Sequence, residues 1–344
     1  MNIWQRSYTP SCSNKARLKK LIIPAGVALF VLSFALSLML GSTKLDIISA
    51  IREIASGEPD AAGRILLYVR IPRALAATLA GSALAVSGVI IQAVLCNAMA
   101  SPSIIGVNAG AGFGVSLLTA FMPAAVSLIP LSAFVGATLT CLMIYLIAAK
   151  TGASRITITL TGIAISSLLT ACMSAVKALF PDTAYNLSSF SVGGLSGISL
   201  KTLWISGSAI VMCLILSVLF SGKIDILALG EDTAHSLGMN VKHTRLALLL
   251  LAGTLAGCAV SFAGLLGFIG LVIPHIVRRF TGDRHRPLTV TSALFGATFV
   301  LICDTVSRIL FAPYELPVGI ILSLVGCPFF IAIILRSGIK KKYD

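Results

Sequence analysis

Charged residues are scarce in this chain. Asp, Glu, Lys and Arg make up only 11% of its 344 residues, whereas about a quarter of the residues in a typical soluble domain are charged. The mean hydropathy is correspondingly high, at +1.00. Because polar side chains keep the surface of a globular protein in water, this shortage excludes a soluble domain of this length. The composition predicts an integral membrane protein.

Motifs for nucleotide chemistry are missing as well. Gly222-Lys223 has neither the upstream glycine nor the following Ser or Thr of a Walker A motif. Gly106, Gly110 and Gly114 do not have the G-x-G-x-x-G spacing of a dinucleotide site. They recur every four residues instead, which predicts a smooth helix face packed closely against a neighbouring helix. The chain is not expected to hydrolyse a nucleotide itself.

Cysteine pairs and ligand clusters are also absent from the sequence pattern. The eight cysteines occur singly, without a C-x-x-C motif, which is typical of free packing thiols. No nucleophile and base pair and no metal-ligand cluster stands out, so no catalytic residue, metal or cofactor is predicted. Ionisable residues within apolar runs are few, which argues against a proton relay. Asp304 and Arg308, four residues apart on one helix face, are compatible with a local ion pair or with a functional role.

Long apolar runs are what the chain has in abundance. Several approach or exceed the roughly 20 residues that a helix needs to cross a membrane. A membrane β-barrel would need short segments of alternating hydrophobicity, so we predict an all-α polytopic bundle. The runs are Leu21 to Leu40, Ala74 to Leu95, Ile104 to Phe121, Ala125 to Ala149, Ile156 to Val176, Leu203 to Phe220, Leu246 to Val277, Leu288 to Val306 and Val318 to Leu335.

One run is too long for one span and too short for two. Leu246 to Val277 has basic segments on both sides, so it should cross the membrane an even number of times. Its length of about 32 residues is less than the roughly 40 that two full spans need. We expect a turn within the glycine-rich stretch Phe262 to Gly270 and at least one short crossing enclosed by protein or a water-filled cavity. The total becomes about ten transmembrane helices, with both termini cytoplasmic.

The basic residues indicate the orientation. A formal net charge of +14 could suggest nucleic-acid binding, but these residues flank apolar runs and are not interleaved with aromatics. If the amino terminus is cytoplasmic, about 18 of the 26 Lys and Arg fall on the inner side. Residues 1–20 lack a cleavage site, so we predict a cytoplasmic segment and not a signal peptide. The expected transmembrane domain covers residues 21–338, with a cytoplasmic segment at 222–245, and a basic cytoplasmic tail covers 339–344.

A short polar island separates the sixth apolar run from the seventh. Glu231 suits the amino end of a short helix, and Gly238 suits its stop. Leu229, Ala234 and Leu237 would form a small apolar face on that helix. The pattern leaves two interpretations open: a docking handle for a soluble partner, or an ordinary amphipathic loop helix on the membrane surface.

A series of longer motifs follows a distinctive order along the chain. They are Arg70-Ile-Pro-Arg73, Leu79 to Gly88 followed by Gln92, Ala100 to Gly114, Leu229 to Gly238, Gly267 to His275, Asp304 to Arg308, Glu315 to Gly319 and Gly326 to Phe330. In this order they resemble the FecCD-type permease family, the membrane subunits of binding-protein-dependent ATP-binding cassette (ABC) importers for ferric siderophores, haem and cobalamin. The resemblance covers essentially residues 20–338.

The resemblance implies an assembly as well as a fold. It implies ten transmembrane helices per subunit in the bacterial cytoplasmic membrane, and a second permease subunit, identical or related. It also implies two cytoplasmic ABC ATPase subunits and an extracytoplasmic substrate-binding protein. The chain itself would have no enzyme activity.

Three groups of residues match functional positions of the family. The segment that would couple to the ATPase contains Leu229, Gly230, Glu231, Ala234, Leu237 and Gly238. The arginines that would face carboxylates of the binding protein are Arg70, Arg73 and Arg308. The translocation path and inner gate are matched by Ala153, Ser154 and Asn97. The turn that begins at Asn97 lacks the proline of the family's Asn-Pro-Leu-Ala pattern, which is expected to loosen it.

The sequence leaves more than one substrate and more than one class of transporter open. We predict an iron-siderophore importer, with cobalamin or haem as the nearest alternatives, because affinity would reside mainly in the binding protein. An ion-coupled secondary transporter gains weak support from the inverted similarity of Leu79-Ala-Gly81 and Leu251-Ala-Gly253. The scarcity of buried carboxylates counts against it. A structural membrane scaffold, which would not depend on any ATPase, is a third possibility.

Overall fold

The computed structural model describes residues 12–43, 46–56, 61–150 and 155–340, and every regular element within them is a helix. Seven helical stretches of this part are long and apolar enough to cross a membrane. They are α1 (Cys12–Met39), the continuous α3 (Ala61–Ile65), π-helical turn (Leu66–Arg70) and α4 (Ile71–Val94), then α6 (Ile129–Lys150), α7 (Arg155–Leu179), α9 (Leu200–Leu219), α12 (Val241–Ala263) and α14 (His285–Ile309).

Three further helices complete the bundle. They are α5 (Val107–Phe121), α13 (Ile269–Thr281) and α15 (Val318–Lys340). Together with the seven longer stretches they make ten bundle helices in the described part of the chain. The predicted all-α polytopic class is therefore confirmed, although three of its helices are short or only partly apolar.

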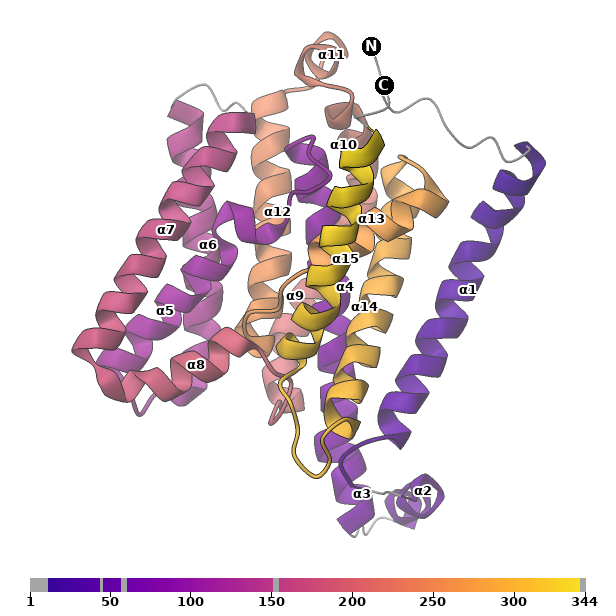
Figure 1. Ribbon diagram of the computed structural model, residues 1–344, viewed down its shortest axis with the longest axis vertical. Coiled ribbons are helices and arrows are strands. Elements are labelled where there is room, and N and C mark those ends of the chain that lie inside the picture. Colours follow the sequence, from indigo (N-terminus) through magenta and orange to yellow (C-terminus); the bar gives the residue numbers. More distant parts are fainter. Residues whose placement is uncertain (1–11, 44–45, 57–60, 151–154, 341–344) are drawn as a thin grey trace.

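Short helices lie at the two ends of the bundle. Figure 1 shows α10 (Ser221–Ala228) and α11 (Glu231–Ser236) at the end where α1 begins and α15 finishes. The opposite end carries α2 (Ile47–Ser56) and α3, and α8 (Ala184–Val192) lies nearer to that end. The topology thus brings both terminal helices to the end that bears α11. That this end is cytoplasmic stays a prediction.

Helix α4 forms the centre of the core because small residues let its neighbours approach closely. It packs against α12, α13 and α14. A Cβ atom on Gly88 would lie 1.8 Å from the carbonyl oxygen of Gly270, and one on Gly81 would lie 2.2 Å from that of Gly296. The helix backbones touch at these points, so no larger residue fits. Packing of this kind is common between membrane helices, where lipid gives no hydrophobic drive for association.

The glycine stripe on α5 packs as the sequence predicted. A Cβ on Gly110 would lie 2.5 Å from the carbonyl oxygen of Gly136, and one on Gly114 would lie 2.4 Å from that of Ser132. Both acceptors belong to α6. The stripe therefore serves contact between two helices.

The long apolar run divides where the sequence predicted. Residues 264–268 form the break between α12 and α13. The backbone there is satisfied by the segment at the end of α8: Leu265 N–H donates to the carbonyl of Phe190 at 3.0 Å, and Gly194 N–H donates to that of Ala263 at 2.9 Å. Irregular backbone at membrane depth is tolerated only with such protein partners.

Candidate functional site

Helices α10 and α11 form a short arm at one end of the bundle (Figure 1). Gly230 precedes α11 with φ of +119°, and Gly238 follows it with φ of +78°. Residues with a Cβ rarely adopt these conformations, so glycine allows the sharp entry into α11 and the sharp exit from it. The predicted helix stop at Gly238 is confirmed.

Two leucines form the exposed apolar surface of this arm. Leu229 is 67% exposed and Leu237 is 63% exposed. Ala234, which the sequence placed on the same face, is fully buried. That placement is wrong because α11 packs against the bundle through Ala234, and the two leucines therefore face outward. Large apolar side chains exposed together at a chain turn are typical of a contact surface.

The carboxylate of Glu231 joins three helices. Its Oε1 lies 2.6 Å from Nη2 of Arg245 on α12 and 3.6 Å from Nε of Arg155, the first residue of α7. The Arg245 side chain is only 1% exposed, whereas that of Glu231 is 41% exposed. Glu231 is thus directed at its own bundle more than at an outside partner. The sequence counted both arginines only as orientation charges, since pairing across such long separations leaves no local pattern.

A second contact ties α10 to the bundle. Asp225 Oδ1 accepts a hydrogen bond from the backbone N–H of His285 at 2.8 Å and lies 2.7 Å from the Nδ1 of the same residue. His285 is the first residue of α14, so Asp225 satisfies one of the free N–H groups of that helix end. The arm is therefore attached to α14 through α10, and to α12 and α7 through α11. No sequence pattern indicated the Asp225 contact.

A charged cluster lies at the opposite end of the bundle. Arg73 on α4 contacts Asp304 on α14 at 3.0 Å and Glu315 in the following loop at 2.5 Å. Asp304 also pairs with Arg308 at 3.2 Å, so the local ion pair that the sequence allowed is present. Arg308 reaches α1 as well, where it donates to Ser37 Oγ at 2.8 Å. The cluster joins three helices and the loop after α14.

Glu315 is the accessible member of this cluster. Its carboxylate also accepts a hydrogen bond from Ser42 at 2.9 Å. Burial by itself would raise the pKa of Glu315, but the hydrogen bond and positive charge of Arg73, together with Ser42, hold the pKa below its ordinary value. The carboxylate is therefore charged at neutral pH and holds the loop against α4.

The three arginines predicted to meet a binding protein are buried in this conformation. Arg70, Arg73 and Arg308 are 3 to 5% exposed. Arg70 donates to the carbonyls of Leu38 and Thr43, at 2.6 Å each. Their guanidinium groups are therefore not free in this conformation, because carbonyls at the end of α1 and the carboxylate of Asp304 already engage them. Their contact with a binding protein stays a prediction.

The predicted gate is only partly described. Ala153 and Ser154 lie outside the described residues. Asn97 is exposed in the turn after α4, at the α11 end of the bundle, and its Oδ1 accepts a hydrogen bond from Met99 N–H at 2.9 Å. Cys96, just before it, has φ of +45°. The turn is thus held by a local side-chain bond in place of the missing proline.

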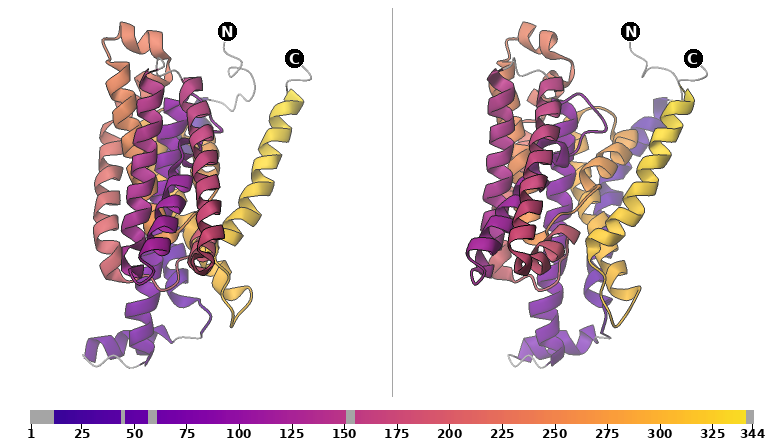
Figure 2. Two further views of the ribbon diagram at one scale, coloured as in Figure 1. Left: turned by 90° about the vertical axis from the view of Figure 1, so that its left-hand side faces the viewer. Right: turned by 60° about the vertical axis from the view of Figure 1, so that its left-hand side comes forward.

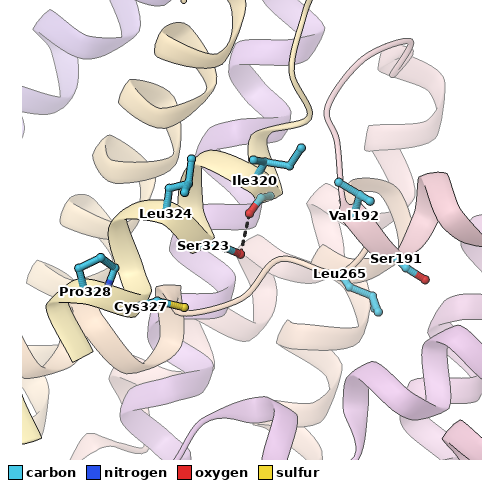
Figure 3. A pocket seen from close by; sticks show the side chains of 9 residues that line it. Ser191, Val192, Leu265, Ile320, Ser323, Leu324, Cys327 and Pro328 are labelled. Atoms are coloured by element: carbon cyan, nitrogen blue, oxygen red, sulfur yellow. Dashed lines mark hydrogen bonds between the residues drawn. The ribbon is translucent and has the colours of Figure 1, made fainter. Parts of the chain in front are cut away.

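A cavity of about 510 Å³ opens beside α15. It is lined by residues from the end of α8, the turn at 264–268 and α15, among them Val192, Leu265 and Ile320 (Figure 3). Ser323 Oγ points back to the Gly319 carbonyl at 2.9 Å. No charged side chain lines this cavity. Its wall is uncharged and mostly apolar.

The described part of the chain has neither a disulfide nor a cluster of metal-ligand side chains. Seven cysteines there are free thiols. In the same residues, no three His, Cys, Asp or Glu side chains lie close enough together to hold a metal ion.

Comparison with known proteins identifies the class of this bundle. The model of the FecCD transport family matches residues 29–336. The hemin transport system permease protein HmuU of Yersinia pestis is 37% identical over 319 residues, which cover 90% of this chain and 95% of that protein. The Fe(3+) dicitrate transport system permease protein FecD of Escherichia coli is 37% identical over 275 residues, covering 79% and 85%.

Two further matches extend this result. The iron(3+)-hydroxamate import system permease protein FhuG of Bacillus subtilis is 32% identical over 336 residues, covering 94% of this chain and 100% of that protein. A solved structure described as a metal-chelate type ABC transporter in an inward-facing conformation matches with a TM-score of 0.82 at 27% identity. That match covers 92% of this chain and 99% of the other.

The helical membrane bundle with its projecting two-helix arm is that of an ABC transporter permease. The chain belongs to the FecCD transport family. It is a multi-pass permease subunit of an ABC importer in the cytoplasmic membrane, and ATP hydrolysis belongs to other subunits. It works with ATPase and binding-protein partners.

Proposed function

We propose that this chain carries an iron-siderophore complex across the cytoplasmic membrane. The names of two relatives of this chain support this substrate: FhuG is named for iron(3+)-hydroxamate and FecD for Fe(3+) dicitrate. Each of these two substrates is a complex of ferric iron with a chelator, which is bulky and polar. Haem is the second candidate, because HmuU, named for hemin, covers nearly the whole chain at 37% identity.

The cavity beside α15 is proposed as one half of the translocation path. Its lining side chains come from α15, the end of α8 and the turn at 264–268 (Figure 3), and Figure 2 shows that α15 leans away from the rest of the bundle toward its carboxyl end. A second permease subunit, identical or related, would close it. Uncharged walls suit such a path, because a cargo that must leave again should not be bound tightly on the way.

The arm of α10 and α11 is proposed as the site of ATPase coupling. Leu229 and Leu237 supply its outward apolar surface, and Glu231 connects α11 to the starts of α7 and α12. Movement of the ATPase would shift α11, and the ion pairs would pass this shift to the two membrane helices. In this proposal the leucines make the contact, and Glu231 transmits the motion.

Contact with the binding protein is proposed at the charged cluster. Arg73 is the best placed of the three predicted arginines, since one of its two partners, Glu315, is 30% exposed on a loop. If an incoming carboxylate displaced Glu315, it would find Arg73 already held by Asp304. Arg70 and Arg308 would support this end of α1 and α14 from within.

Reconstitution tests the proposed function. Liposomes containing this permease, its ATPase and its binding protein should take up a ferric hydroxamate only with ATP, and uptake should persist when ion gradients are collapsed. Parallel arms with hemin and cobalamin identify the substrate class. Preferential uptake of hemin would replace the siderophore assignment, and gradient-driven uptake without the ATPase would contradict the importer mechanism.

A further inference from the structure

A second cavity, of about 460 Å³, lies between α1 and the connection from α13 to α14. It is lined by Ile22, Ile23, Thr281, Arg284 and Pro287. Figure 1 shows that the amino-terminal part of α1 leans away from the bundle. The cavity lies beside this part of α1. The space is therefore a wedge between one splayed helix and the body of the protein.

The narrow end of the wedge is closed by a tight helix contact. A Cβ on Gly26 would lie 3.0 Å from the ring of Phe295 on α14. Ile22 and Ile23 lie one turn before Gly26, where α1 has begun to separate. The cavity thus has an apolar floor that continues along α1, whose apolar side chains such as Val27 are exposed.

The wide end of the wedge is basic. Arg284 is exposed, and among the described residues no carboxylate forms an ion pair with it. Asp283, its neighbour in sequence, pairs with Arg278 at 3.8 Å. Residues 278–286 contain four arginines and one aspartate, and the carboxylate of Asp225 contacts His285, so this region carries a net charge of +2 when His285 is neutral.

The cavity also lies at the level of a membrane boundary. The apolar stretch of α1 begins at Leu21. The cavity is lined by residues at this start, at the end of α13 and at the first turn of α14. A basic rim above an apolar wall at this depth matches the division between a lipid headgroup and its acyl chains.

We propose that this wedge binds an anionic phospholipid, with its phosphate at Arg284 and an acyl chain along Ile22 and Ile23. The apolar wall favours a lipid over a free phosphate ion, which would gain nothing from the isoleucines. The net charge of +2 favours an anionic lipid over a zwitterionic one, because basic pockets between membrane helices concentrate acidic headgroups. The site shares no lining residue with the cavity beside α15.

The experiment titrates delipidated permease with phosphatidylglycerol or phosphatidylcholine and counts bound lipids by native mass spectrometry. We expect one phosphatidylglycerol to bind in preference to phosphatidylcholine. R284Q should weaken this preference about fivefold, which corresponds to the ~1 kcal/mol that one basic residue contributes near an anionic headgroup. The matched control is R286Q, which removes a nearby exposed arginine that does not line the cavity.

A second variant tests the apolar half of the site. I23W fills the wedge without changing its charge and should lower the occupancy of the bound lipid, while monodispersity in gel filtration shows that the protein remains folded. Equal binding of the two lipids would overturn the proposal, as would equal losses for R284Q and R286Q. Displacement of the lipid by inorganic phosphate at moderate concentration would assign the site to a free anion instead.

Discussion

The carboxylate oxygen Oε1 of Glu231 on α11 lies 2.6 Å from Nη2 of Arg245 near the start of α12. The carboxylate is partly exposed, whereas the guanidinium is almost wholly buried. A buried guanidinium is costly in free energy unless it is paired and hydrogen-bonded. The pair therefore holds the projecting arm in a defined position on the membrane helices. Because Arg155 at the start of α7 lies near the same carboxylate oxygen, the position of α11 is linked to two membrane helices at once.

The first prediction concerns this link. E231Q weakens the contact with Arg245 by roughly 1.5 to 3 kcal/mol, the range for a hydrogen bond to a charged group. We expect ATP-driven uptake to fall about tenfold while the ATPase still copurifies with the permease. D232N is the matched control, since it removes the neighbouring charge, which forms no ion pair in the described structure. Loss of copurification in E231Q would mean that Glu231 contacts the ATPase directly.

The second prediction separates contact from transmission. L237D places a charge on the exposed apolar surface of the arm, where an interface residue contributes about 1 to 3 kcal/mol. We expect copurification of the ATPase to fall tenfold or more. S236D adds the same charge at the preceding exposed position without removing a leucine and should have a smaller effect. If both variants keep the ATPase at the wild-type level, the arm is an ordinary loop helix.

The third prediction tests the close packing of α4. G88A places a methyl group 1.8 Å from the Gly270 carbonyl oxygen, so the helices must separate. We expect a loss of stability of about 3 kcal/mol or more, the upper part of the range for overpacking, seen as a lower temperature of thermal unfolding in detergent. G194A is the control, because nothing lies within 4 Å of the added Cβ. Wild-type stability of G88A would contradict the described helix contact.

The fourth prediction compares the two carboxylates of the charged cluster. D304N leaves Arg73 and Arg308 buried without their shared carboxylate, and removing one partner from a buried ion pair costs about 3 to 5 kcal/mol. E315Q should cost no more than about 1 kcal/mol, since Glu315 is partly exposed and solvent screens the pair. Chemical or thermal unfolding of the two variants checks the order. Equal losses would show that burial does not set the energies of this cluster.

The fifth prediction is a pH dependence at Glu315. A carboxyl with a lowered pKa in the folded state stabilises the protein above its unfolded pKa, and this contribution is lost as the pH falls through the folded pKa. The loop that carries Glu315 should therefore stay protected from hydrogen exchange from neutral pH down to mildly acidic pH and open only in stronger acid. E315Q should open the same loop at pH 7. Equal protection in the variant and the wild type would exclude Glu315 as the group that holds the loop.

Much of the fold could be predicted from local patterns. Apolar length gave the spans, and the shortage of residues in the run from Leu246 to Val277 correctly located a break before α13. The spacing of Gly106, Gly110 and Gly114 indicated a helix contact, and α6 supplies it. These predictions succeeded for one reason. Because lipid restricts the backbone to helices, hydropathy predicts where the spans lie and glycine spacing predicts where helices touch.

The site was less predictable because its chemistry is long-range. The pairing of Glu231 with Arg245 and Arg155, and that of Arg73 with Asp304 and Glu315, depends on which helices become neighbours. The sequence could place Arg73 near one end of a span, but it could not show that two carboxylates already occupy it. Likewise, the orientation of α11 decided that Ala234 is buried.

The sequence by itself determined that this chain is a helical membrane protein, that one span is broken, and that a polar arm interrupts the apolar runs. Only the tertiary structure decided which charged side chains form ion pairs within the protein and which surfaces stay exposed. The physical reason is that membrane insertion depends on the local sum of side-chain hydrophobicity. The environment of a buried charge, or the existence of a wedge such as that beside Arg284, depends on the packing of helices far apart in the sequence.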